Sequence, residues 1–375
     1  ATLKILDDNS NQLGATVHLD VSDIQGLDNV FLAGTIPTEA GHDNTVKDIN
    51  VYGAGTTVSS QVDVGYNLAG ASYTSESFDY VGAKSGSDSN DVYEMDISPD
   101  GTKLYFSDGQ DDGIYQIPLT TAFDLTTADL ANKHFFDLGG NVDPYSLDFN
   151  ADGTMVYYYG SDNNYNKRYR AFDLPTAWDL SSQSSSSHSN AKWDLNIQTD
   201  IGSNKTILDV TWSADGTKLY VNTAEDQKIH LFDSWSTPFG AESSPTYTYQ
   251  GVTLDCTTFG YAYNGWTPTT MCYNHEWNDD GTKLYIGSYS EYKEFSVSTA
   301  WDLSSTVTAT GNTFDAINDG GVTGDSARHG GWGDNGKIWY QIVRDGTSAG
   351  NIYSFDTVSQ VTQHTTTYPC LLYTS

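Results

Sequence analysis

Apolar and polar residues alternate along most of this chain, and an Asp-Gly turn interrupts the alternation at recurring places. The stretches YEMDISPDG, YSLDFNADG, LDVTWSADG and YNHEWNDDG each end in such a turn, at Asp100, Asp152, Asp215 and Asp280. Alternation with a period of two is the pattern of a half-buried strand, and Asp-Gly supplies the positive φ angles of a tight hairpin. Each unit therefore begins with a predicted β-hairpin.

Further strands follow each hairpin. The turns lead into KLYFS, MVYYYG, KLYVN and KLYIG, and a worn fifth copy, GDNGKIWYQIV, starts at Gly333 with Asn335 in place of the aspartate. A third strand follows, such as GIYQIPL from Gly113, and a fourth, such as KHFFDLGG from Lys133. Four antiparallel strands in a repeat of roughly 40–50 residues are typical of a propeller blade. The predicted fold is all-β, a β-propeller with five recognisable blades; six or seven in the full protein is the alternative.

Two recurring phrases carry a resemblance. SPDGTKLYF followed by IYQIPL resembles the YVTN-type and WD-repeat-like blades of secreted and periplasmic proteins. DGTK[LM]Y combined with TA[FW]DL, at Thr121, Thr176 and Thr299, is similar to repeat arrays in predicted virion and surface proteins of marine viruses and bacteria. The resemblance covers about residues 70–360 and implies an extracellular, cell-surface or virion location. It implies little about chemistry, because propellers include enzymes, scaffolds and receptor binders.

Three segments are expected along the chain. Residues 1–69 contain strand-like stretches but no Asp-Gly-Thr-Lys turn, and are expected to form an N-terminal β module or a degenerate blade. Residues 70–369 are expected to form the propeller. Residues 370–375, CLLYTS, match the translation of a transposon-based sequencing adapter, so we expect Cys370 to have no biological role.

The charge of the chain limits its partners. It has 17 basic and 49 acidic residues and a net charge of −32. Such a charge repels polyanions, so nucleic acids and anionic lipid surfaces are poor partners. No apolar run approaches the roughly 20 residues of a membrane-spanning helix. The expected partner is a protein or glycan surface, without membrane insertion, and self-association into a homo-oligomer stays open.

Two cysteines flank the longest insertion, which separates the third and fourth units. Cys256 and Cys272 enclose the loop CTTFGYAYNGWTPTTMC. Such a pair in an extracellular protein suits a disulfide, and two free buried thiols are the alternative. A zinc site would need further ligands at short spacing, which the sequence does not offer.

Catalytic motifs are incomplete, so we expect a protein that is not an enzyme. HEWND at His275 lacks the second histidine of a zinc-binding HExxH, and His275 occupies an apolar slot of the repeat. GDSARHGG from Gly324 lacks the G-x-S-x-G pattern of a nucleophilic serine.

Acidic residues recur in the innermost predicted strands. Glu94, Asp96, Asp148, Asp209 and Glu276 take slots that would line the central channel. Oxygen-rich sites suit hard cations, so Ca²⁺ is the candidate ion, and no other cofactor is expected. An ordinary water-filled polar lining is the alternative.

Aromatic residues of the insertion are the candidate ligand-binding surface. Phe259, Tyr261, Tyr263 and Trp266 lie between glycines in a loop, where exposed rings can stack on sugars. The alternative is that these rings cap the blade beneath them.

Two functions follow from these features. The first is a non-enzymatic binding or structural module, in a virion tail or fibre or in cell-surface adhesion, that recognises a host or a glycan. The second is a lactonase-like propeller hydrolase with a metal at the mouth of the channel.

Overall fold

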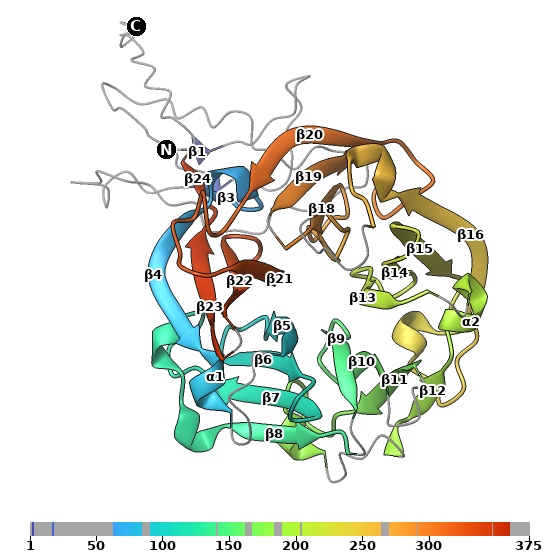
Figure 1. Cartoon of the computed structure of the whole chain (residues 1–375), viewed down its shortest axis with the longest axis horizontal. Coiled ribbons are helices and arrows are strands. Elements are labelled where there is room, and N and C mark those ends of the chain that lie inside the picture. Colours follow the sequence, from blue (N-terminus) through green and yellow to red (C-terminus); the bar gives the residue numbers. More distant parts are fainter. Residues whose placement is uncertain are drawn as a thin grey trace, which may run out of the picture. The chain divides into compact units, whose positions relative to one another are not determined.

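Five four-stranded antiparallel sheets surround a central axis in this computed structural model (Figure 1). The prediction of an all-β propeller is therefore confirmed, with five blades. The propeller unit comprises Gly65–Val358. The structure describes residues 65–84, 91–139, 142–161, 167–183, 190–202, 205–263, 270–289, 291–346 and 348–358, and the backbone of residues 2–3, 17–18, 63–64 and 359–360.

Each blade runs from an innermost strand to an outermost strand. The first two blades are β5 (Val92–Ile97), β6 (Lys103–Asp108), β7 (Gly113–Pro118), β8 (His134–Asp137) and β9 (Asp143–Phe149), β10 (Met155–Ser161), β11 (Lys167–Asp173), β12 (Trp193–Leu195). The next two are β13 (Ile207–Trp212), β14 (Leu219–Thr223), β15 (Lys228–Asp233), β16 (Thr248–Asp255) and β17 (Asn274–Trp277), β18 (Lys283–Gly287), β19 (Tyr292–Val297), β20 (Val307–Phe314). The fifth is β21 (Ser326–Gly333), β22 (Ile338–Asp345), β23 (Ala349–Asp356) and β4 (Ser72–Asp79).

The remaining elements are short. The two α-helices among the described residues are α1 (Tyr80–Ala83) and α2 (Gln198–Ile201), and none of the helices described could cross a membrane. Two-residue strands form the pairs β1 (Thr2–Leu3) with β2 (Val17–His18) and β3 (Asp63–Val64) with β24 (Ser359–Gln360), in a second unit. The rest of the expected N-terminal module and residues 370–375 lie outside the described residues.

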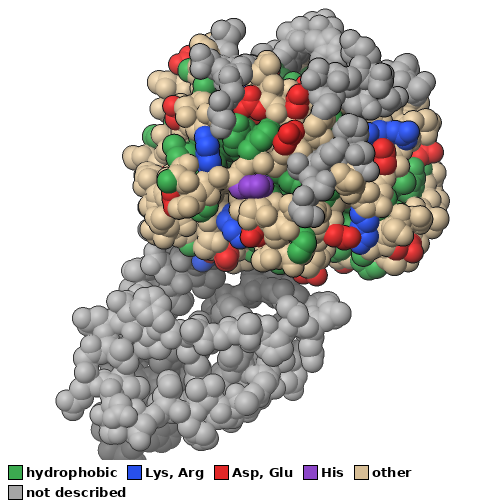
Figure 2. All heavy atoms as spheres, turned by 90° about the horizontal axis from the view of Figure 1, so that it is seen from below, with side chains coloured by type: hydrophobic (Ala, Val, Ile, Leu, Met, Phe, Trp, Pro, Cys, Tyr) green, Lys and Arg blue, Asp and Glu red, His purple; other side chains and the backbone are tan. Residues whose placement is uncertain are grey.

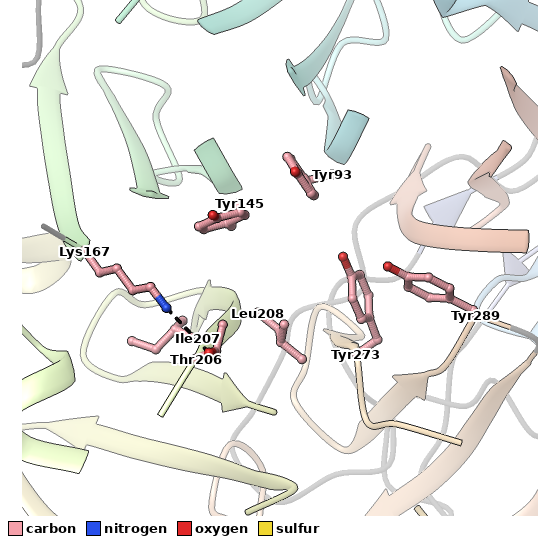
Figure 3. Close-up of a pocket in the computed structure, with 8 residues that line it drawn as sticks. All are labelled: Tyr93, Tyr145, Lys167, Thr206, Ile207, Leu208, Tyr273 and Tyr289. Carbon is pink, nitrogen blue, oxygen red and sulfur yellow. Dashed lines mark hydrogen bonds between the residues drawn. The ribbon is translucent and has the colours of Figure 1, made fainter. Parts of the chain in front are cut away.

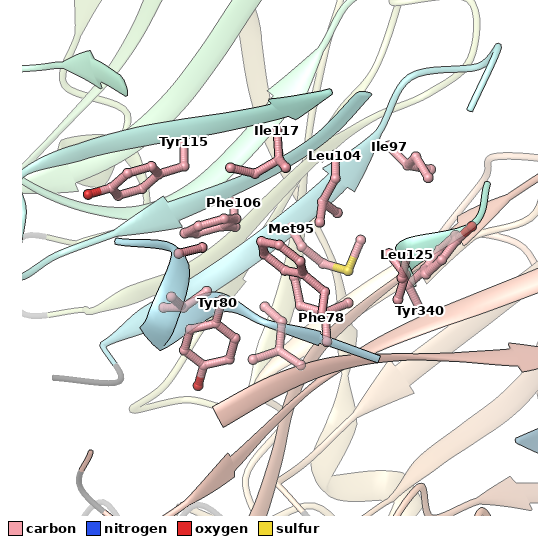
Figure 4. Close-up of a cluster of buried hydrophobic side chains, with 14 of the residues drawn as sticks. Phe78, Tyr80, Met95, Ile97, Leu104, Phe106, Tyr115, Ile117, Leu125 and Tyr340 are labelled. Atoms are coloured by element: carbon pink, nitrogen blue, oxygen red, sulfur yellow. The ribbon is translucent and has the colours of Figure 1, made fainter. Parts of the chain in front are cut away.

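The fifth blade closes the ring with a strand from the other end of the chain. Its outermost strand, β4, precedes the first repeat in sequence and pairs antiparallel with β23, where Phe78 lies opposite Ile352. Figure 4 shows how Phe78 and Tyr80 then pack against Phe106 and Tyr115 of the first blade. Further apolar clusters fill the other four interfaces between adjacent blades. Burial between blades therefore holds the ring together on all sides.

An aromatic residue covers the glycine of the turn between the two innermost strands in every blade. Each of these aromatic residues has φ between 59° and 65°, and its N–H donates to the carbonyl oxygen of the glycine over 2.6–3.0 Å. A non-glycine residue in this left-handed region costs about 1–3 kcal/mol, and the surroundings must hold it there. The pairs are Phe123 on Gly101, Trp178 on Gly153, Phe239 on Gly216, Trp301 on Gly281 and Tyr66 on Gly336.

A tyrosine of the preceding blade fixes each of these aromatic residues. The tyrosine lies in the second strand of that blade, and its hydroxyl donates to the carbonyl oxygen of the aromatic residue over 2.5–2.8 Å. The pairs are Tyr105 with Trp178, Tyr157 with Phe239, Tyr220 with Trp301, Tyr285 with Tyr66 and Tyr340 with Phe123. The five hydrogen bonds form a closed ring from blade to blade, which accounts for the recurrence of Asp-Gly-Thr-Lys, the tyrosine that follows and the TA[FW]DL phrase.

This arrangement predicts a large penalty for any side chain at a turn glycine. In Gly153→Ala the new Cβ would lie 2.2 Å from the indole of Trp178, so the ring must move and its contact with the first blade weakens. We expect a loss of about 3 kcal/mol in the free energy of unfolding, measured by chemical denaturation.

Gly251→Ala is the matched control for this substitution. Gly251 also has a positive φ, of 75°, but no atom lies within 4 Å of the place that an added methyl group would take. It should cost only about 1 kcal/mol, the backbone contribution alone. Equal losses in the two variants would contradict the role given to the aromatic cover.

Candidate binding site at the channel mouth

Four of the five innermost strands contain a bulge that directs two consecutive side chains toward the channel. In β5, Val92 pairs with Asp108 and Met95 pairs with Phe106, so β5 holds one residue more than β6 over this span. The same irregularity occurs in β9, β13 and β21. A bulge breaks the strict alternation of a strand and re-aims side chains. The residues seven and six places before the turn can therefore both face the channel.

The residues seven places before the turn form the mouth of the channel. A cavity of about 320 Å³ is lined there by Tyr93, Tyr145, Lys167, Thr206, Ile207, Leu208, Tyr273 and Tyr289 (Figure 3). The ring centroids of Tyr93 and Tyr145 are 5.1 Å apart, and those of Tyr273 and Tyr289 are 4.4 Å apart. Two pairs of packed rings, from three blades, thus face each other across the cavity.

Two cations accompany these rings. The guanidinium of Arg328 lies 5.3 Å from the ring centroid of Tyr93 and 5.5 Å from that of Tyr289, and donates to the carbonyl oxygen of Val92. Lys167 Nζ lies 3.5 Å from Thr206 Oγ1, and partial burial lowers the pKa of its ammonium. Both groups sit at one small site in a chain with a net charge of −32. The mouth therefore combines apolar ring faces with hydrogen-bond donors.

The residues six places before the turn form a buried layer directly beneath the mouth. Glu94, Asp209 and His329 offer ligand atoms that all lie within 4.8 Å of one another. His329 Nε2 is 3.4 Å from Glu94 Oε1 and 3.2 Å from Glu276 Oε1. Three of the five acidic residues predicted to line the channel thus meet around a histidine.

The backbone of the neighbouring blade fixes these carboxylates. Glu94 Oε2 accepts a hydrogen bond from Leu147 N–H over 2.9 Å, and Asp209 Oδ2 accepts one from His275 N–H over 2.7 Å. Each bond joins the innermost strands of two successive blades. The carboxylates therefore stay in place without a bound ligand.

Burial and mutual repulsion shift the pKa values in this layer. Burial, together with the charges of Asp209 and Glu276, raises the pKa of Glu94 well above its ordinary value. Burial opposes ionisation of Asp209 too, but His275 and His329 outweigh it and lower the pKa of Asp209. Burial alone would lower the pKa of His329, whereas Glu276, Asp209 and Asp96 together raise it. The layer holds more carboxylates than positively charged side chains, so protons or cations must balance its negative charge.

The other two predicted acidic residues lie one step deeper. Asp148 Oδ2 accepts a hydrogen bond from Trp212 N–H over 2.9 Å, and Asp96 Oδ1 accepts one from Ile97 N–H over 2.7 Å. Burial raises the pKa of Asp96 to about 7 and that of Asp148 well above its ordinary value. Neither belongs to the group formed by Glu94, Asp209 and His329. Binding of an ion by any of the five stays a prediction.

The aromatic residues of the insertion lie in two places. Some pack against the third and fourth blades, and one packs near the mouth. Tyr261 is 3% exposed and its hydroxyl donates to the carbonyl oxygen of Ile286, while the ring of Phe259 packs on Phe295. Tyr263 is half-buried and packs against a cluster that includes Leu208 and Tyr273, both of which line the cavity. Trp266 lies outside the described residues. Ligand binding by this insertion stays a prediction.

The two cysteines of the insertion lie together. Cys256 and Cys272 are buried as free thiols, with their sulfur atoms 2.9 Å apart. Burial, followed by the proximity of Cys256, raises the pKa of the Cys272 thiol well above its ordinary value. Because metals bind the thiolate form, this environment favours a thiol pair or a disulfide over a metal site.

Sequence reasoning missed the residues that line the mouth and the histidine beneath it. The signal for the mouth was a tyrosine seven places before the turn in three units, Tyr93, Tyr145 and Tyr273. His329 occupies the equivalent of Glu94 and Asp209 in the fifth unit, but that copy is worn and rich in glycine. Aligning all five units on their turns would have placed His329 in the same layer.

Comparisons with known proteins find distant structural similarity to other proteins. No family model matches the chain, and no curated protein matches it. It is similar to a functionally unknown protein from Desulfotomaculum acetoxidans, with 10% identity over 74% of this chain and 71% of that one and a TM-score of 0.37. Candidate 6-phosphogluconolactonases from Bacteroides uniformis (14% identity, 76% and 74% coverage) and Bacteroides fragilis (15%, 73% and 71%) have the same TM-score. Likeness at this level assigns no activity, and the YVTN or WD-repeat type stays a prediction.

The position of the two thiols predicts that they form a disulfide when the protein is kept under oxidising conditions. We expect Cys256 and Cys272 to resist alkylation in denaturant until a reductant is added, as read by peptide mass spectrometry. Because the bond would close a short loop, reduction should lower the free energy of unfolding by about 3 kcal/mol. Full alkylation of both residues without reductant would contradict the prediction.

Proposed function

We propose that this propeller is a non-enzymatic recognition module that binds glycans at the channel mouth, on a cell surface or a virion. The observation that carries the proposal is the tyrosine-lined cavity, of about 320 Å³. Small-ligand sites measure roughly 300–1,000 Å³ and combine apolar walls with a few convergent polar groups. Tyrosine suits sugars because its ring face packs on the C–H face of a pyranose while its hydroxyl exchanges hydrogen bonds with sugar hydroxyls.

The way the mouth is supported favours binding of a rigidly oriented ligand. The tyrosines come from several blades, and two of them, Tyr93 and Tyr289, pack on Arg328, which is itself buried and bonded to the first blade. Side chains held by such packing lose little entropy when a ligand binds. Tyr263 borders the same cavity through Leu208 and Tyr273, so the insertion would extend the sugar-binding surface.

The composition of the cavity wall favours binding over hydrolysis. Among the described residues, those that line the cavity include no carboxylate, cysteine or histidine to act as a nucleophile or general base. In a lactonase-like hydrolase, the buried carboxylates beneath the tyrosines would have to contact the substrate. On the face shown in Figure 2, the described acidic and basic side chains are interspersed among neutral ones.

The proposal predicts binding that depends on the tyrosines of the mouth. We expect the full chain to bind members of an immobilised oligosaccharide array. Isothermal titration of a soluble hit should show weaker binding for Tyr145→Ala and for Tyr263→Ala. Loss of one stacking ring costs on the order of 1 kcal/mol, which is about fivefold in Kd.

Tyr73→Ala is the matched control, because Tyr73 is also half-buried but lies on β4, the outermost strand of the fifth blade. Its affinity for the same oligosaccharide should stay unchanged. Binding to no member of the array, or equal binding by all three variants, would overturn the proposal. Hydrolysis of lactones or polysaccharides that is lost with the buried carboxylates would favour the alternative function.

A further inference from the structure

We propose that Glu94, Asp209 and His329 bind one divalent transition-metal ion, Mn²⁺ or Zn²⁺, in the channel beneath the tyrosine-lined mouth. The proposal stands on the geometry of this layer and does not depend on glycan binding above it. The three side chains come from the first, third and fifth blades, and their ligand atoms lie within 4.8 Å of one another. Such a spacing lets a single ion contact all three.

Unpartnered polar atoms within the cluster point to a cation as their partner. Asp209 is 1% exposed, and its Oδ1 accepts no hydrogen bond from the described residues. His329 is 2% exposed, and neither of its ring nitrogens makes a hydrogen bond of normal geometry within the described part of the chain, although Nε2 lies near two carboxylates. Buried polar atoms without partners are costly, and a metal ion would satisfy them.

The charges of the layer point in the same direction. Glu94, Asp209 and Glu276 face one another with His329 between them, and His275 Nδ1 lies 2.9 Å from Asp209 Oδ2. Arg328, in the layer above, is directed at tyrosine rings and at the carbonyl oxygen of Val92. A divalent cation would add positive charge beside the three carboxylates.

The ligand types select the class of ion. Ca²⁺ takes six to eight oxygen ligands, whereas imidazole nitrogen combined with carboxylate oxygen suits Zn²⁺ and Mn²⁺. Three protein ligands leave coordination positions for water or for an oxygen of a bound molecule. Glu276 Oε1 lies 3.2 Å from His329 Nε2, the same ring nitrogen that faces Glu94. The Ca²⁺ expected from the acidic residues alone is therefore replaced here by a transition metal, because of His329.

The test is direct titration of the full chain. After dialysis against a chelator and then metal-free buffer, Mn²⁺, Zn²⁺ and Ca²⁺ are titrated separately by calorimetry, and bound Mn²⁺ is counted by electron paramagnetic resonance. We expect one Mn²⁺ or Zn²⁺ per chain, bound more tightly than Ca²⁺. Asp209→Asn and His329→Gln should each weaken binding by at least about tenfold, since even the loss of a supporting residue typically costs 10–100-fold.

Asp226→Asn is the matched control. Asp226 also lies in the third blade and beside a histidine, with Oδ2 3.8 Å from His230 Nε2, but it is outside the cluster. It should leave the affinity unchanged, and circular dichroism establishes that each variant is folded. Because the wild-type titration stands alone, a variant that fails to fold does not remove the test. Absence of a bound ion, tighter binding of Ca²⁺, or equal binding by folded Asp209→Asn and Asp226→Asn would overturn the proposal.

Discussion

The hydrogen bond from a tyrosine of one blade to the aromatic residue that covers the next turn is the interaction on which the ring depends. Apolar packing between blades is strong but not directional, and alone it would permit neighbouring blades to slide. A hydroxyl such as that of Tyr220, bonded to the carbonyl oxygen of Trp301, fixes the height of one blade against the other. The aromatic residue can hold its left-handed backbone only because the turn glycine below leaves room for the ring.

The channel depends on this fixed geometry. Carboxylates of the innermost strands reach across to backbone N–H groups of the next blade, as Glu94 does to Leu147. A shift between blades would break these bonds and leave buried charges without partners, which costs far more than the loss of a surface contact. The bulges then divide the axial side chains into an aromatic mouth and a polar layer beneath it. One local irregularity, repeated in four blades, therefore produces both the aromatic mouth and the polar layer.

Much of the fold could be predicted because the same local rules recur in each unit. The Asp-Gly turn and period-two alternation located β5 and β6, and β8 lies within the stretch predicted from KHFFDLGG. The closing strand was harder, since β4 belongs to the fifth blade although it precedes the first turn. Likewise Phe239 and Tyr66 take the place of the TA[FW]DL aromatic residue without that phrase around them. Their role is set by a contact with a tyrosine of the preceding blade, which the short-range pattern does not encode.

The site was predictable only in part, for a related reason. Alternation placed Glu94 and Asp209 toward the channel. Strict alternation would put Tyr93 and Arg328 on the opposite side, because a bulge has no reliable signature in a single strand. His329 adds nothing to the acidic composition and sits in the least regular copy of the repeat. Its contact with Glu94 and Asp209 depends on the closed ring, and an alignment of all five units on their turns is needed to place the three residues in one layer.

The pairing of β4 with β23 also has a consequence for how the protein folds. The paired residues Phe78 and Ile352 are separated by most of the propeller sequence, whereas the first four blades are built from local hairpins. Contacts between distant residues form slowly, because a long chain must close before they contribute. Four blades can therefore be complete while the ring is still open, with the apolar faces of the first and fourth blades exposed to solvent. The final docking step, late and entropically expensive, would be the period in which this protein is most vulnerable to aggregation and to chaperone capture.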